Sequence, residues 1–372
     1  MQDRRSDPLR IAFFGSSLVS AYWNGAATYY RGIVRALHDR GHRISFYEPD
    51  AFGRQEHRDI PDPPYARVVV YPSTPEGVGA ALTEARGADV VVKASGVGIF
   101  DELLEEEVLS FGRDGSAVVF WDVDAPATLD RVGGEGDDPF RALIPDYDAV
   151  FTYGGGEPVR RRYVSLGAQR CEPVYNALDP QTHHPAPPKE EFGGTLSFLG
   201  NRLPDREHRV EEFFLGPAGS LPSARFLLGG SGWGDRLLPE NVRFLGHVYT
   251  RDHNAFNSTP LAVLNISRES MARYGFSPAT RVFEAAGAGA CLITDEWDGI
   301  ERFLEPGEEV LVAESGEQVT EHLRALDHER AREVGCRARR RVLEEHTYAH
   351  RAEQVEAALT ALLGPKGVPV DE

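Results

Sequence analysis

The chain has 372 residues, of which 41% are hydrophobic and 26% are charged, so it is long enough for two globular domains and does not have the composition of a disordered protein. Its formal net charge of −18 argues against sequence-independent nucleic-acid binding and against stable adhesion to anionic membranes. No apolar run is long enough to span a bilayer, and the cysteines Cys171, Cys291 and Cys336 have no disulfide or metal-site spacing. We therefore expect a cytoplasmic protein with no nucleic-acid partner and no membrane span.

The first half of the chain alternates short apolar runs with helical patterns, which predicts a parallel α/β sheet. The predicted strands lie at 9–14, 44–47, 66–71, 89–93, 117–121 and 149–152, with helices at 76–85 and 102–111 between some of them. Gly15-Ser-Ser-Leu after the first strand lacks the spacing of a dinucleotide fingerprint, so a nicotinamide cofactor is not supported. Ligands of such sheets bind beyond the carboxyl ends of the strands.

Polar or glycine residues follow three of these predicted strands. Asn24 and Gly25 lie in the loop after the first strand, Ser95 and Gly96 follow the fourth, and Trp121, Asp122 and Asp124 end the fifth. A carboxylate there could act as a general base toward an acceptor hydroxyl, or both aspartates could cap backbone N–H groups in an Asx-turn. We weigh these two interpretations about evenly, and Asp124 is the stronger catalytic candidate.

A proline-rich stretch at 175–188 predicts a linker between two domains, because four prolines cannot continue a helix or a central strand. Its adjacent histidines, His183 and His184, point apart on an extended chain and do not predict a metal site. A second series of strands and helices begins after the linker. The strand at 195–199 runs into Gly200, Asn201 and Arg202, and Arg206 follows, a pattern that is typical of a phosphate clamp but is also compatible with surface charge.

The stretch 274–292 predicts a loop, a capped helix and a buried strand. Ser277 is the expected N-cap and Pro278 the first helical residue, with Arg281 and Glu284 three residues apart on one face. The start of such a helix, after a parallel strand, is an anion site. The alternative, at about even odds, is a helix that packs on its sheet and carries an exposed ion pair.

The sequence Arg281-Val-Phe-Glu-Ala-Ala-Gly-Ala-Gly, together with Leu292-Ile-Thr-Asp and Phe303-Leu-Glu-Pro-Gly-Glu-Glu, resembles the C-terminal domain of GT-B glycosyltransferases, and is most similar to the CgeB-like (spore maturation protein) family. The resemblance implies two Rossmann-like, doubly wound parallel-sheet domains facing a central cleft. It also implies that the helix start holds the donor diphosphate and that Glu284 binds a ribose or sugar. Phe276 stands where many related retaining enzymes carry a second glutamate.

The resemblance, combined with the patterns above, predicts an N-terminal acceptor-side domain at 1–175, a linker at 176–194, a nucleotide-sugar-binding domain at 195–345 and a helix at 346–364 that returns to the first domain. The predicted catalytic residues are Asp124, Arg281 and Glu284. The predicted donor-binding residues are Gly200, Asn201, Arg202, Arg206, His247, Val248, Tyr249, Phe276, Ser277, Pro278, Ala279, Thr280, Arg281 and Glu284. The predicted acceptor-binding residues are Asn24, Gly25, Trp121 and Asp122.

The predicted function is metal-independent transfer of a sugar from a nucleotide-diphosphate-sugar, with UDP, dTDP or GDP as the nucleotide, to an acceptor hydroxyl. No cofactor other than this co-substrate is expected. Two alternatives stay open: a non-catalytic sugar-nucleotide-binding partner protein, for which Phe276 is an argument, and a sugar-nucleotide epimerase of the same architecture. Nothing in the sequence identifies the acceptor, the stereochemistry or the oligomeric state.

Overall fold

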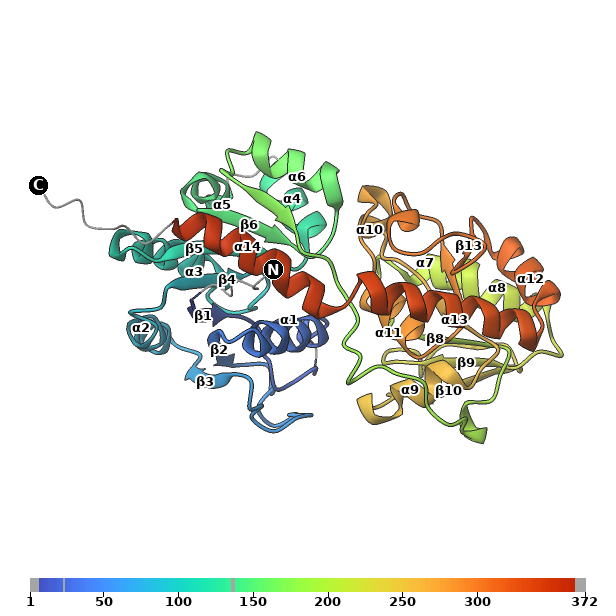
Figure 1. The fold of residues 1–372 in the computed structure, drawn as a ribbon. Coiled ribbons are helices and arrows are strands. Elements are labelled where there is room, and N and C mark those ends of the chain that lie inside the picture. The colour runs from blue at the N-terminus through green and yellow to red at the C-terminus, as the bar shows by residue number, and fades with distance from the viewer. Residues whose placement is uncertain (1–6, 23, 135–137, 365–372) are drawn as a thin grey trace, which may run out of the picture. The chain divides into compact units, whose positions relative to one another are not determined.

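The computed structural model describes residues 7–22, 24–134 and 138–364, and these form two compact units (Figure 1). Unit 1 comprises Met1–Tyr175 and Tyr348–Glu372, and unit 2 comprises Asn176–Thr347. Each unit has its own parallel β-sheet, with helices in the connections between strands. In the part of the chain that is described, no helix has both the length and the apolar character needed to cross a membrane.

Unit 1 is built on a seven-stranded sheet in the order β3-β2-β1-β4-β5-β6-β7, and every neighbouring pair is parallel. The strands are β1 (Arg10–Phe14), β2 (Arg43–Asp50), β3 (Arg67–Pro72), β4 (Val90–Ala94), β5 (Ala117–Asp122), β6 (Ala149–Thr152) and β7 (Cys171–Pro173). The helices are α1 (Ala27–Asp39), α2 (Pro75–Glu84), α3 (Asp101–Glu107), α4 (Ala125–Gly133), α5 (Pro139–Leu143), α6 (Gly156–Ser165) and α14 (Tyr348–Leu363). The strand order reverses between β1 and β4, which makes that point the expected ligand edge.

The centre of unit 1 consists of β-branched and aromatic residues. β4 and β5 are buried along their whole length, as expected for central strands covered on both faces. Trp121 packs against Phe13 and Phe151 and donates its Nε1 hydrogen to the Tyr29 hydroxyl at 2.9 Å. α14 packs against α1, where Gly32 lets the Tyr348 ring approach: a Cβ at position 32 would lie 2.2 Å from that ring.

Unit 2 repeats the same strand order with six parallel strands, β10-β9-β8-β11-β12-β13. The strands are β8 (Leu196–Leu199), β9 (Phe226–Gly229), β10 (Val242–Gly246), β11 (Ala262–Asn265), β12 (Leu292–Asp295) and β13 (Leu311–Ala313). The helices are α7 (Glu207–Val210), α8 (Gly216–Ser220), α9 (Thr250–Ser258), α10 (Glu269–Tyr274), α11 (Thr280–Gly287), α12 (Gly316–Ala325) and α13 (His328–Glu345). The switch point of this sheet lies between β8 and β11. The prediction of two doubly wound parallel-sheet domains is confirmed.

The predicted start of α11 is wrong. The helix begins at Thr280 with Ala279 at the N-cap position, and the Ser277 hydroxyl instead donates to the Gly275 carbonyl at 2.9 Å. The physical reason is a sharp turn just before it: Gly275 and Phe276 both have positive φ, and the Phe276 N–H donates to the Asp298 carbonyl at 2.6 Å. The chain therefore enters the helix two residues later than its cap-like sequence indicates.

α7 begins at Glu207, and the charged stretch near the end of unit 2 forms two helices, α12 and α13. Ser315 and Asp327 cap these helices by accepting hydrogen bonds from the N–H groups of Gln318 and Arg330. A capping side chain before each apolar face separates the two helices.

Candidate functional site

The carboxyl edge of the unit 2 sheet carries a buried arginine at the switch point. Arg281, one residue into α11, donates from Nη2 to the Leu199 carbonyl at the end of β8, at 3.3 Å. Its Nη1 lies 3.7 Å from Glu284 Oε2, and the two side chains are only 14% and 8% exposed. The pair is therefore buried, unlike the exposed ion pair that was the alternative interpretation. Burial lowers the pKa of Arg281, and Glu284 opposes that effect.

Two histidines that lie far from Glu284 in the sequence close around its carboxylate. Nε2 of His183 lies 3.8 Å from Glu284 Oε1, and the ring of His253 on α9 stacks on that of His183 at 6.4 Å. Burial alone would raise the pKa of Glu284, but His183, Arg281 and His253 outweigh it and hold the pKa below its ordinary value. Glu284 is thus a carboxylate that is kept ionised. Within residues 7–22, 24–134 and 138–364, no group of three or more His, Cys, Asp or Glu side chains is arranged to hold a metal ion.

Arg206 is the second cation at this edge. Its guanidinium lies over the Phe198 ring at 5.6 Å, and its Nη2 donates to the Asn201 carbonyl at 2.5 Å. Burial lowers the pKa of Arg206 to about 10, and the nearby charge of Arg281 acts in the same direction. A Cβ on Gly200 would lie 2.8 Å from Arg206 Nη2, so a glycine is needed for this approach. Arg206 and Arg281 therefore act on each other electrostatically at the switch point, where Asp205 and Asp295 offset part of the positive charge.

Arg202, which belongs to the same predicted phosphate clamp, is held differently. Its Nη1 bonds Asp235 at 3.1 Å and its Nη2 bonds Glu207 at 2.7 Å. Asn201 accepts from the Ser231 N–H through its side-chain oxygen at 2.9 Å. Both residues brace the loop after β8 against the loop after β9, so Arg206 and not Arg202 lies beside Arg281.

The predicted donor-binding residues His247, Val248 and Tyr249 follow β10 in a partly exposed segment. Val248 is buried and its carbonyl lies 3.1 Å from His253 Nε2. Tyr249 is 59% exposed, with the His247 ring against its edge at 4.7 Å and the Arg251 guanidinium over its face at 5.3 Å. Tyr249 thus presents an exposed aromatic side chain directly after Val248, which contacts His253, and such a side chain is compatible with base stacking.

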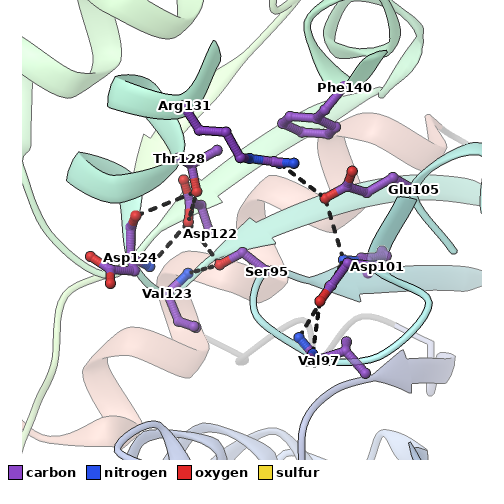
Figure 2. Close-up of polar contacts among 12 residues, drawn as sticks. Ser95, Val97, Asp101, Glu105, Asp122, Val123, Asp124, Thr128, Arg131 and Phe140 are labelled. Atoms are coloured by element: carbon purple, nitrogen blue, oxygen red, sulfur yellow. Dashed lines mark hydrogen bonds and ion pairs between the residues drawn. The ribbon is translucent and has the colours of Figure 1, made fainter. Parts of the chain in front are cut away.

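Figure 2 shows how the two aspartates after β5 differ in unit 1. Asp122 is fully buried, and its Oδ1 accepts from Ser95 Oγ at 2.8 Å, the Asp124 N–H at 3.0 Å and Thr128 Oγ1 at 3.0 Å. Its Oδ2 accepts from the Tyr163 hydroxyl. Burial raises the pKa of Asp122, while these donors oppose the rise. Asp122 organises the turn, and both of its carboxylate oxygens are already used by these donors, so neither is available to bind the hydroxyl of an acceptor substrate.

Asp124 occupies the N-cap position of α4, where its carbonyl accepts from the Thr128 N–H at 3.0 Å. The residue is half-buried, and its carboxylate points away from the Asp122 cluster (Figure 2). Its side chain does not cap the helix. Of the two aspartates, Asp124 is the one whose position is compatible with contact to a substrate.

The remaining predicted acceptor residues are mostly taken up by internal contacts. Asn24 uses its amide within its own loop, donating to the Ser17 and Ser20 carbonyls at 2.8 and 3.0 Å and accepting from Ser16 Oγ at 2.9 Å. Trp121 is 1% exposed in the core. Gly25 is exposed, with open space around its α-carbon.

A buried ionic network, which the sequence did not reveal, lies beside this turn. Lys93 at the end of β4 is fully buried, 2.5 Å from Asp101 Oδ1 and 3.6 Å from Glu105 Oε1. Arg131 on α4 reaches the same Glu105 oxygen at 3.3 Å, and Asp101 also accepts from the Val97 N–H (Figure 2). Its cations and carboxylates neutralise one another. The network therefore braces β4, α3 and α4.

Comparison with known proteins supports this description. Residues 206–357 match a family model described as glycosyl transferase-like. Sucrose-phosphate synthase from Thermosynechococcus elongatus is 16% identical, with 95% of this chain and 99% of that chain covered and a TM-score of 0.69. Anabaena HepE in complex with UDP and glucose is 13% identical, with 95% and 100% covered and a TM-score of 0.68. The fold is GT-B. No curated protein sequence matches the chain.

A third GT-B structure is an α-glucosyltransferase in complex with UDP and a 13-mer DNA that contains an HMU base. It is 11% identical to this chain, with 95% and 100% covered and a TM-score of 0.70. The predicted architecture is thus confirmed, and the description of the family model, glycosyl transferase-like, agrees with the predicted enzyme class. At these identities the structural matches establish the fold alone. The individual site residues stay predictions.

Proposed function

We propose that the protein transfers a sugar from a nucleotide-diphosphate-sugar to an acceptor hydroxyl without a metal ion, as a member of the CgeB-like branch. The observation that carries the proposal is the placement of Arg281 and Arg206 at the switch point of unit 2. Ligands of doubly wound sheets bind at this point. Two partly buried cations beside a helix N-terminus suit a diphosphate, whose negative charge they and the N–H groups of the first helical turn would neutralise.

Glu284 is the proposed ligand of the ribose or sugar hydroxyls. Its pKa is held low by His183, Arg281 and His253, so it accepts hydrogen bonds as a carboxylate. A hydroxyl donor then finds a preorganised acceptor in a site shielded from water. The exposed ring of Tyr249 is the proposed stacking surface for the nucleobase.

In the proposed reaction the bond between the sugar carbon and the diphosphate oxygen breaks, and the bond between that carbon and the acceptor oxygen forms. The diphosphate leaves with the bonding electrons, and Arg281 and Arg206 stabilise its growing charge. Asp124 takes the proton of the acceptor hydroxyl. These assignments require only side chains of this chain and the two substrates.

The test is a thermal-shift and calorimetric titration with UDP, dTDP, GDP, ADP and CMP, with and without magnesium. A nucleotide at a hundred times its dissociation constant should stabilise the protein by about 2.7 kcal/mol. We expect one nucleoside diphosphate to bind equally with and without magnesium, and Arg281→Gln to abolish binding. Arg332→Gln, on an exposed residue of α13, is the matched control. Failure of all five nucleotides to bind the wild type would overturn the donor site.

The Asp124→Asn variant distinguishes an enzyme from a protein that only binds the nucleotide sugar. With the nucleotide sugar that binds, the wild type should release nucleoside diphosphate slowly through hydrolysis and faster once an acceptor is found. Asp124→Asn should bind that donor with unchanged affinity and lose acceptor-dependent turnover by about a hundredfold or more. A protein that binds the donor but shows no release with any acceptor would instead be the non-catalytic binding partner.

A further inference from the structure

Two exposed aromatic side chains lie on neighbouring loops at the carboxyl edge of the unit 1 sheet. Phe52, in the loop after β2, is 56% exposed, and Tyr22, in the loop after β1, is 41% exposed. Strands β1 and β2 pair directly, so these loops leave the sheet side by side. Large apolar side chains of this size usually lie in the core, and exposed ones at a ligand edge need an explanation.

The backbone of Phe52 is held in a conformation that bulky residues avoid. Its φ is +57°, in the left-handed region that favours glycine. Strain of this kind persists where the surroundings enforce it, and it clusters at functional sites. The Phe52 ring lies over the loop after β4, where a Cβ on Gly98 would be 2.9 Å from the ring atom Cε2. The strained backbone of Phe52 thus holds its ring against the loop after β4, while more than half of the side chain stays exposed.

A buried arginine fixes the three loops around this ring. Arg54 is 5% exposed, and its Nη1 donates to the Ser16 carbonyl at 3.1 Å and to the Val97 carbonyl at 3.3 Å. These carbonyls belong to the loops after β1 and β4, and Arg54 itself belongs to the loop after β2. The Arg54 guanidinium also lies 5.0 Å from the centre of the Phe52 ring. The ring is therefore positioned before any ligand arrives.

The second aromatic side chain, Tyr22, is held by residues of the loop after β2. The Tyr22 ring stacks on His57 at 4.0 Å with an interplanar angle of 10°, and His57 Nδ1 lies 2.8 Å from the carbonyl of Gly53, the neighbour of Phe52. Asp59 anchors both loops, since it accepts from the Ala21 N–H at 2.9 Å and pairs with Arg31 at 2.7 Å. The rings of Phe52 and Tyr22 are thus both held by the connected loops after β1 and β2.

We propose that Phe52 and Tyr22 form a stacking site for a neutral, flat ring of the acceptor, either the apolar face of a sugar or an aromatic aglycone. The assignment of this ring to the acceptor rests on the proposed function, whereas the existence of the ring-binding site does not. Stacking of a flat ligand on an aromatic face tolerates many structures and contributes enough to select ring-bearing molecules. Two rings are too small a surface for a stable protein interface, so the ligand is a small ring or the end of a chain.

The experiment is saturation-transfer NMR with phenyl β-D-glucopyranoside, which carries both kinds of ring, and with glycerol as a ring-free control. No nucleotide is added, so failure of the donor site and failure of this site are separate results. We expect the wild-type protein to transfer magnetic saturation to the protons of the probe and none to those of glycerol. Transfer to the glucosyl protons identifies a sugar-binding site, and transfer to the phenyl protons alone identifies an aglycone-binding site.

Variants then assign the signal to the rings. Phe52→Ala and Tyr22→Ala should each weaken probe binding about fivefold or more. Phe52→Tyr should keep it, and Val164→Ala, which removes a 48% exposed apolar side chain from α6 of the same unit, should leave it unchanged. Phe52→Asn tolerates the positive φ, so loss of binding in a protein that stays folded excludes a purely structural role for the ring. No transfer to the wild type, or equal transfer to Phe52→Ala and the wild type, would overturn the proposal.

Discussion

The two units have the same strand order but very different carboxyl edges. In unit 1 Asp122 is surrounded by hydroxyl and N–H donors, and Lys93 and Arg131 both contact Glu105. In unit 2 the partly buried arginines Arg206 and Arg281 act on each other electrostatically, and Glu284 is an ion-pair partner of Arg281. A charge whose partners are all within the fold stabilises the fold, whereas crowded buried cations are typical of a site for an anion.

The largest expected effect tests the structural side of this comparison. Asp122→Ala leaves the buried donors of Ser95, Thr128 and Tyr163 without their acceptor, so we expect the free energy of unfolding to fall by about 3 kcal/mol or more. Urea denaturation measures this change. The matched control is Asp114→Ala, since Asp114 pairs with Arg86 on the exposed surface and its loss should cost less than about 1 kcal/mol. Equal losses for the two variants would refute the structural role of Asp122.

The second prediction uses pH to contrast the two edges. Burial lowers the pKa of His253 from its ordinary 6.5 to about 4, with Arg281 and His183 acting in the same direction and Glu284 against it. Between these values the folded protein binds fewer protons than the unfolded chain, so acidification from pH 6.5 to 4 destabilises the fold. A pKa change of this size corresponds to roughly 3 kcal/mol. In unit 1 the raised pKa of Asp122 has the opposite sign, because its protonation favours the folded state.

The measurement is the free energy of unfolding at several pH values between 7 and 4, for the wild type and His253→Gln. Glutamine keeps a donor toward the Val248 carbonyl but does not titrate. The variant should therefore lose less stability on acidification than the wild type. Parallel curves for the two proteins would show that burial does not hold His253 neutral in the folded protein.

These sites also show what a sequence reveals and what it does not. The sheets were predictable because apolar runs alternate with helical patterns, and Arg281 and Glu284 were predictable because they are three residues apart on one helix. His183 and His253 come from distant segments and meet only in the folded unit. Asp122 and Asp124 look equivalent in sequence, yet the register of β5 buries one and leaves the other half-buried. Ser277 resembles an N-cap, but the turn at Gly275 and Phe276 delays the helix.

A third prediction sharpens the anion-binding side of the comparison. Arg206 lies beside Arg281, whereas Arg202 is tied to Asp235 and Glu207. We expect Arg206→Gln to weaken binding of the preferred nucleoside diphosphate about tenfold or more, the scale of a lost charge-assisted hydrogen bond. Arg202→Gln should weaken it less than about threefold. Calorimetric titration measures both. The reverse order of the two effects would move the phosphate site to the exposed loop.

The smallest expected effect compares the strained phenylalanines of the two edges. Phe52 and Phe276 both have positive φ, which asparagine tolerates better, so replacement by asparagine relieves strain of about 1 kcal/mol at each. Phe52 is 56% exposed and loses little packing, so Phe52→Asn should raise the free energy of unfolding by about that amount.

The ring of Phe276 packs closely over Gly299, where an added Cβ would lie 2.2 Å from it. Phe276→Asn loses that contact, so we expect no net gain in stability. Urea denaturation of the two variants beside the wild type measures the difference. A gain for Phe52→Asn alone means that the fold bears a cost at Phe52 that its packing does not offset, as expected for a ring kept for binding. Equal gains would mean that both rings are strained to the same degree, and the distinction between the two edges would then rest on their charges alone.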